Sequence, residues 1–154
     1  MIDHEPQHLE QSRRRARVLL AEDDDELRRM LREALEAGGH DVFEVIDGGR
    51  LLVRLGQEYR SGKPEQSFDL LLSDVRMPVC TGLQIVESLR LARSRIPVIL
   101  ITAFGDDATR ARAERLGAVL VDKPFDVDEL VSIVGRLLIR DLRAREQERQ
   151  GFDA

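Results

Sequence analysis

The chain has 154 residues, 42% of them hydrophobic, which suits a single domain because a unit of about this size buries about 70% of the surface that its unfolded chain exposes. The formal net charge is -5, and residues 18–138 carry 22 acidic and 16 basic side chains, which argues against direct nucleic-acid binding. The single cysteine, Cys80, excludes an internal disulfide and suits the cytoplasm, and residues 1–17 lack the apolar run of a secretion signal or a membrane span.

The pattern of hydrophobic residues divides the chain into three parts. Residues 17–138 carry the alternating patterns of one folded domain, and residues 1–16 precede it as an extension that we expect to be flexible. The apolar stripe fades after residue 138, so residues 139–154 are expected to form a continued helix or a disordered tail. A tail of this length is too short for a second domain.

The first half of the domain predicts two strands, each followed by a helix. The apolar run at residues 18–21 is a short buried strand. The helix after it has its apolar face at Leu27, Met30, Leu31, Ala34 and Leu35. Glycines 38–39 end that helix, because glycine readily adopts the conformations that terminate helices. A second strand is expected at residues 42–45, and Asp47 is the N-cap of the helix that follows.

The second half continues the alternation of strands and helices. A third strand is expected at residues 68–73 and a third helix at 83–92. The run at 97–102 is nearly all apolar, so it predicts a central strand that is covered on both faces. A fourth helix at 107–116 and a fifth strand at 118–121 complete the pattern, which is typical of a parallel α/β sheet wrapped by helices.

The last helix is expected to begin after Asp126, which forms a capping pair with Glu129. Its apolar residues, which should pack on the sheet, are Leu130, Val134 and Leu137. The basic residues expected to face solvent along it are Arg136, Arg140 and Arg143.

Polar side chains stand at the carboxyl ends of four of the expected strands. The first strand ends at Glu22 and Asp23, the third at Asp74, the fourth at Thr102, and the fifth just before Lys123. Parallel α/β sheets bind ligands at this edge. Two carboxylates about 4 Å apart repel by about 4 kcal/mol unless a proton or a cation bridges them. Oxygen ligands without a nearby histidine or cysteine favour Mg2+, which commonly also binds a phosphate.

Four motifs occur in order along the domain. They are Leu19–Asp24 (LLAEDD), Asp69–Pro78 (DLLLSDVRMP), Thr102–Ala103 and Asp122–Phe125 (DKPF), with Gly82 after the second. Through these motifs residues 17–138 resemble the receiver domains of two-component response regulators. The resemblance implies a flavodoxin-like fold, which is a doubly wound, five-stranded parallel sheet with strand order 2-1-3-4-5.

The resemblance also implies a set of metal ligands. Asp23 would bind Mg2+ directly and Glu22 mainly through water, while Asp74 and the Arg76 carbonyl would complete the protein ligands. The acid pair is taken as Glu22 and Asp23 because the leucine and arginine at positions 27–28 then have the spacing of that family.

In such a domain Asp74 accepts a phosphoryl group from a histidine kinase or a histidine phosphotransfer protein. Lys123 neutralises the phosphoryl charge, and Thr102 binds a phosphoryl oxygen and couples the change to the surface. The protein would then act as a switch with slow self-dephosphorylation, and not as an enzyme. Its expected partners are the phosphodonor and a downstream protein, with weak homodimer formation on phosphorylation and no direct contact with nucleic acid or membrane.

Two features depart from the family pattern. Leu120 stands where an aromatic residue often turns inward on activation, so a rotamer switch of that kind is excluded. Arg76 and Phe104 stand two residues after Asp74 and Thr102, where bulky side chains are expected to shield an acyl phosphate from water.

Two other functions use similar residues. An Mg2+-dependent phosphohydrolase with an aspartyl nucleophile usually carries a second aspartate two residues later, where this chain has Arg76. A receiver-like adapter that is never phosphorylated normally lacks one of the acids, the acceptor or the lysine, and this chain has them all.

Overall fold

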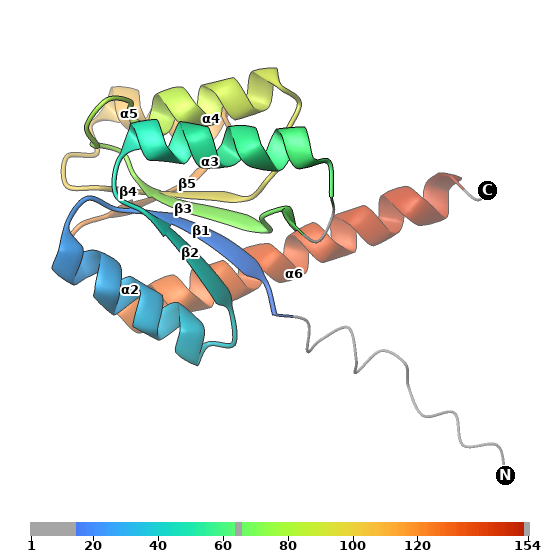
Figure 1. The fold of residues 1–154 in the computed structure, drawn as a ribbon, viewed down its shortest axis with the longest axis horizontal. Helices are drawn as coiled ribbons and strands as arrows, with labels where there is room; N and C mark the ends of the chain where they lie inside the picture. The colour runs from blue at the N-terminus through green and yellow to red at the C-terminus, as the bar shows by residue number, and fades with distance from the viewer. Residues whose placement is uncertain (1–14, 64–65, 153–154) are drawn as a thin grey trace, which may run out of the picture.

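The computed structural model describes residues 15–63 and 66–152 (Figure 1). The strands in this part of the chain are β1 (Arg17–Ala21), β2 (Asp41–Val45), β3 (Leu70–Asp74), β4 (Val98–Thr102) and β5 (Val119–Asp122). The helices are α2 (Asp25–Ala37), α3 (Gly48–Ser61), α4 (Gly82–Leu91), α5 (Asp107–Arg115) and α6 (Val127–Phe152). Most of the extension predicted at residues 1–16 lies outside the described residues, so its flexibility stays a prediction.

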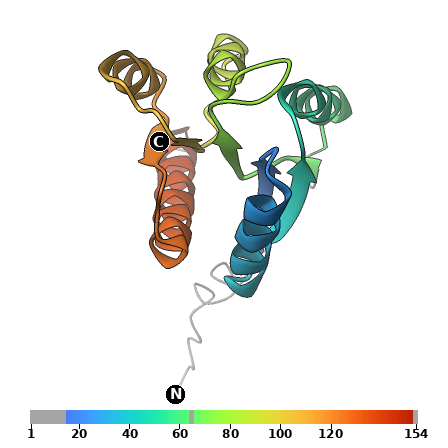
Figure 2. The ribbon, with the colours of Figure 1, turned by 90° about the vertical axis from the view of Figure 1, so that its left-hand side faces the viewer.

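The five strands are parallel and lie in the order β2-β1-β3-β4-β5, which confirms the predicted fold and strand order. Every residue of β3 and β4 is buried, because helices cover both faces of the sheet. Figures 1 and 2 show α2 and α6 on one face and α3, α4 and α5 on the other. The apolar run at 97–102 is therefore a central strand, as expected.

Alternate side chains along each strand pack into two hydrophobic cores, one on each face of the sheet, since successive residues point to opposite faces. The core under α2 and α6 contains Val18, Leu20, Leu31, Leu35, Leu70, Leu72, Ile99, Ile101, Leu130 and Val134. The core under α3, α4 and α5 includes Leu19, Leu51, Leu55, Leu71, Leu83, Ile85, Leu100 and Ala113. Together the two cores hold the sheet rigid and leave its carboxyl edge free for polar residues.

Aspartate caps set the starts of several helices. Asp24 accepts a hydrogen bond from the Leu27 N–H at 2.8 Å where α2 begins, and Asp47 caps α3 as predicted. At the start of α6, Asp126 accepts a hydrogen bond from the Glu129 N–H at 3.1 Å. The cap on α2 ends the β1–α2 turn immediately after the predicted acid pair.

The third strand begins two residues later than the hydrophobic pattern suggests, at Leu70. The Phe68 N–H donates to the Glu58 carboxylate at 3.0 Å, so this group is already paired with a side chain of α3. Asp69 accepts a hydrogen bond from the Arg17 N–H at 2.8 Å. The Asp69 N–H still donates to the Arg17 carbonyl at 2.8 Å, so side-chain contacts supplement the backbone pairing where β3 begins.

Helix α6 continues as far as Phe152, so residues 139–152 are helical. Its inner side is apolar at Leu130 and Val134, both buried, but farther along it carries Asp141, which forms an ion pair with Arg145 at 2.9 Å. The arginines expected to face solvent, Arg136, Arg140 and Arg143, are exposed. None of the helices in the described part of the chain has the length and apolar character that a membrane span requires.

Candidate functional site

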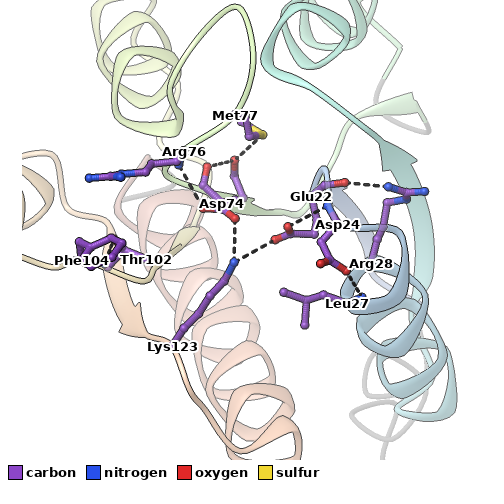
Figure 3. Close-up of polar contacts among 11 residues, drawn as sticks. Glu22, Asp24, Leu27, Arg28, Asp74, Arg76, Met77, Thr102, Phe104 and Lys123 are labelled. Carbon is purple, nitrogen blue, oxygen red and sulfur yellow. Dashed lines mark hydrogen bonds and ion pairs between the residues drawn. The ribbon is translucent and has the colours of Figure 1, made fainter.

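The carboxyl ends of four strands bring the predicted site residues together (Figure 3). Asp74 and Thr102 are the last residues of β3 and β4, and the register pairs Thr102 with Asp122, the residue before Lys123. Glu22 directly follows β1. The site is therefore built by strand register, which places residues far apart in the sequence at one edge of the sheet.

Three carboxylates form the acidic part of the site. One oxygen from each of Glu22, Asp23 and Asp74 lies within 4.8 Å of the others. Glu22 and Asp74 are only 1% and 6% exposed, whereas Asp23 faces solvent. Carboxylates this close repel one another strongly, the more so because two of them are shielded from water.

Glu22 has a buried carboxylate oxygen that accepts no hydrogen bond from the described residues. Its Oε2 atom is buried and has no hydrogen-bond partner among the described residues, although the Lys123 Nζ atom is 3.8 Å away. Burial, followed by repulsion from Asp74, raises the pKa of Glu22 to about 7. A set of oxygen ligands with one unsatisfied buried member fits a hard divalent cation such as Mg2+.

Lys123 supplies the positive charge of the site. Its Nζ atom donates to Asp74 Oδ2 at 2.9 Å. Partial burial by itself lowers the pKa of Lys123, but the hydrogen bond to Asp74 and the charges of Asp74, Glu22 and Asp23 outweigh it, so the pKa is raised. The ammonium group is thus held charged beside the carboxylate that we expect to react.

The other predicted residues lie beside Asp74. The Arg76 N–H donates to Asp74 Oδ1 at 3.0 Å, while the predicted role of the Arg76 carbonyl as a metal ligand stays a prediction. Thr102 is 2% exposed, and its hydroxyl oxygen accepts a hydrogen bond from the Phe104 N–H at 3.2 Å. The Arg76 guanidinium lies 4.9 Å from the centre of the Phe104 ring, within the range of a cation–π contact. The two bulky residues therefore connect the loops that follow β3 and β4.

Gly82 has a physical reason to be glycine. A Cβ atom at this position would lie 2.6 Å from the Asp74 carbonyl oxygen and 3.0 Å from the Leu100 side chain. The Gly82 N–H donates to the Val75 carbonyl at 2.9 Å. The loop after β3 can fold back tightly only with no side chain here, and this close approach holds Asp74 at the strand end.

Sequence reasoning missed one arginine next to the acids. Arg28 served only to align the acid pair, but its guanidinium donates to the Glu22 carbonyl at 2.9 Å (Figure 3). A basic residue one turn into a helix that follows an acidic turn is the signal that could have drawn notice to it.

A family model described as the response regulator receiver domain matches residues 18–135. The chain belongs to this family of receiver domains. The match covers all five strands except Arg17, the first residue of β1, and every predicted site residue from Glu22 to Lys123. Response regulators are components of two-component signalling systems, so the receiver domain takes part in signal transduction.

Curated relatives and solved structures agree with this family. Regulatory protein AtoC of Escherichia coli is 37% identical over 79% of this chain and 25% of its own length, and transcriptional regulatory protein CpxR of E. coli is 35% identical over 86% and 53%. The chain thus spans between a quarter and about half of these relatives. A CheY-like receiver domain protein from Methanospirillum hungatei has the same fold, with a TM-score of 0.74 and 20% identity over 85% of this chain and 99% of its own.

Proposed function

We propose that this receiver domain accepts a phosphoryl group on Asp74 in an Mg2+-dependent reaction. The observation that carries the proposal is the position of Asp74 between two kinds of partner. Its Oδ2 atom is 2.9 Å from the Lys123 ammonium, and its carboxylate also belongs to the cluster formed with Glu22 and Asp23. Asp74 is thus the acid of this cluster that accepts a hydrogen bond from Lys123, whereas Glu22 lies 3.8 Å from the same ammonium group without one.

The chemistry follows from this arrangement. A carboxylate oxygen of Asp74 attacks the phosphorus of a phosphohistidine, the P–N bond breaks, and its electron pair leaves on the imidazole nitrogen. Lys123 moves from Asp74 to a phosphoryl oxygen, and the Thr102 hydroxyl donates to another. Mg2+ held by Glu22, Asp23, Asp74 and the Arg76 carbonyl would neutralise negative charge on the phosphoryl oxygens. Water later hydrolyses the acyl phosphate and restores the carboxylate.

The partners follow from the same chemistry. The donor is a histidine kinase or a histidine phosphotransfer protein in the cytoplasm, and the signal passes to a downstream protein through the surface that Thr102 influences. Weak association of two phosphorylated copies is a second route for the signal. Sedimentation with and without beryllofluoride, which mimics a phosphoryl group, tests this route, and an unchanged monomer would exclude it.

The phosphohydrolase alternative conflicts with the surroundings of Asp74. A general acid two residues after the nucleophile would have to occupy the position of Arg76, whose guanidinium instead lies over the Phe104 ring. The adapter alternative conflicts with the presence of all three acids, the lysine and the threonine at one edge of the sheet. Both alternatives make different predictions from ours in a labelling experiment.

Incubation with acetyl phosphate and Mg2+, followed by intact mass measurement, tests the proposal. We expect the mass of one phosphoryl group to be added, and addition of EDTA to prevent it. An adapter would gain no mass. A phosphohydrolase would instead turn over p-nitrophenyl phosphate, which we expect the protein to leave intact.

The roles of the two neighbouring acids are tested by their metal affinities. A direct ligand contributes more than one that acts through water, so Asp23→Ala should weaken Mg2+ binding more than Glu22→Ala does. Titration calorimetry of both variants measures the order. The reverse order would mean that Glu22 is the direct ligand.

A further inference from the structure

Arg28 connects three parts of the structure behind the acidic cluster. It lies on the first turns of α2, and its side chain is 15% exposed. One guanidinium nitrogen donates to the Glu22 carbonyl at 2.9 Å and another to the Asp25 carboxylate at 2.6 Å. The Nε atom is 3.5 Å from the carboxylate of Glu44 on β2. A partly buried arginine with partners on the β1–α2 turn, α2 and β2 loses little freedom when it binds them.

The contact with the Glu22 carbonyl bears directly on the acid pair. This carbonyl belongs to the peptide that joins Glu22 to Asp23, and a peptide is planar, so holding its oxygen also orients the bonds that lead to both Cα atoms. The turn is also held at the other end, where the Glu22 N–H donates to the Val45 carbonyl at 3.2 Å. Arg28 thus completes the restraint on the backbone that carries the two acids.

The Glu22 side chain is restrained separately. Its Oε1 atom accepts a hydrogen bond from the Asp24 N–H at 3.2 Å, while Oε2 is the buried atom without a partner. The Glu22 backbone and side chain are therefore both restrained, and Oε2 remains free for the water-mediated contact with the metal. The contacts of Arg28 lie on the backbone side of this arrangement.

We propose that Arg28 is a positioning residue for metal binding, which orients Glu22 and Asp23 by holding the peptide between them. This inference rests on the proposed function, since it assumes that the acids bind Mg2+. Groups that orient metal ligands commonly contribute tenfold or more to metal affinity without touching the metal. Arg28 performs this role through a backbone carbonyl.

The sign of the effect separates positioning from simple electrostatics. A cationic guanidinium near a cation site repels the metal, so loss of its charge alone would strengthen Mg2+ binding. Loss of a positioning contact would weaken it, because the acids would then sample orientations that do not bind. A measured loss of affinity thus cannot be assigned to the charge.

The test is titration calorimetry of Mg2+ into the full chain and three variants. Arg28→Met removes all three contacts and keeps an unbranched side chain, and we expect it to raise the Kd about tenfold. Arg29→Met is the matched control, since Arg29 is the next residue, is exposed, and carries the same charge. We expect its Kd to be unchanged or slightly lower. Arg28→Lys keeps the charge but cannot bridge three partners, so its Kd should lie between those of Arg28→Met and the parent chain.

The outcomes distinguish this inference from the proposed function. If the parent chain binds Mg2+ and Arg28→Met binds it equally or more tightly, Arg28 has no positioning role and the proposed metal site stands. If the parent chain itself fails to bind Mg2+, the metal site is wrong. Circular dichroism and thermal unfolding without metal establish that each variant is folded. If Arg28→Met does not fold, the Kd of Arg28→Lys decides whether Arg28 has a positioning role.

Discussion

The charged groups at the two edges of the sheet differ in how they are paired. At the amino edge, the Arg17 guanidinium lies 4.3 Å from the centre of the Phe43 ring and donates to the Ser67 carbonyl at 3.2 Å. At the carboxyl edge, three carboxylates share one nearby ammonium group, and Glu22 Oε2 has no hydrogen-bond partner among the described residues. Arg17 at the amino edge is thus paired within the protein, although the nearby His40 Nδ1 atom also has no partner among the described residues, whereas the acidic cluster at the carboxyl edge has more carboxylates than cationic groups.

Arg90 is a second arginine near the amino edge that is paired with protein groups. Its guanidinium donates to three backbone carbonyls, those of Leu116, Ser94 and Ile96, at 2.8 to 3.0 Å. Burial lowers the pKa of Arg90, but the carbonyls satisfy its donors. Proteins tend to break the rules of polar pairing at functional sites, and the crowded carboxylates of the carboxyl edge are such a break. The comparison therefore predicts that changes at the amino edge affect stability and changes at the carboxyl edge affect signalling.

The largest effect is expected from Asp74→Asn. The amide cannot act as the nucleophile, so labelling by acetyl phosphate should be abolished while the fold is retained. Asp24→Asn is the matched control, because Asp24 is an exposed acid of the same region and asparagine caps a helix equally well. Intact mass and circular dichroism measure both properties. Labelling of the Asp74→Asn variant at the parent rate would show that another residue is the acceptor.

Arg90→Met should lower the free energy of unfolding by about 3 kcal/mol, because it leaves three carbonyls without their charged donor. Urea denaturation measures the loss, and Arg115→Met, which removes an exposed charge near the end of α5, should change stability little. Acetyl phosphate should label the folded Arg90→Met variant at the parent rate. A variant as stable as the parent would contradict the role that we assign to Arg90.

Glu22→Gln should change how stability depends on pH. The pKa of Glu22 is raised from 4.5 to about 7, so the metal-free folded state binds this proton more tightly than the unfolded state does. Its contribution to stability is complete below pH 4.5 and is lost as the pH rises through 7. Compared with Glu22→Gln, the parent chain should lose about 3 kcal/mol across this interval.

Urea denaturation at several pH values without metal provides the comparison for Glu22. Saturating Mg2+ should remove most of the parent's loss above pH 7, since the charge of the bound metal favours the ionised form of Glu22. Parallel stability curves for the parent and Glu22→Gln would show that Glu22 titrates normally.

The smallest effect is expected from Phe104→Ala. Phe104 is 68% exposed and supports the Arg76 guanidinium, so its removal should open the site to water and accelerate loss of the phosphoryl group severalfold. Leu91→Ala, which removes an exposed apolar side chain at the end of α4, is the control. Phosphoryl lifetimes from timed intact-mass measurements decide the matter, and an unchanged lifetime would mean that the pair does not shield the site.

The sequence by itself determined the elements of the fold and the edge at which the polar residues meet. Alternating apolar runs and helical periods are local patterns, so they predicted the five strands, the buried β4 and the Asp47 cap. The motifs around Glu22, Asp74 and Lys123 identified the family that the match to residues 18–135 shows. The start of β3 was less well predicted, because the Glu58 contact with Phe68 spans ten residues.

Only the tertiary structure decided the electrostatics of the site. Lys123 and Asp74 are 49 residues apart in the sequence, and their 2.9 Å contact depends on the register of three neighbouring strands. The raised pKa of Glu22 arises from burial, which depends on how the helices close over the sheet. The contact between Arg28 and the Glu22 carbonyl involves a backbone atom that every residue type has. Residue types therefore indicate which groups can react, and packing decides which of them are left without a partner.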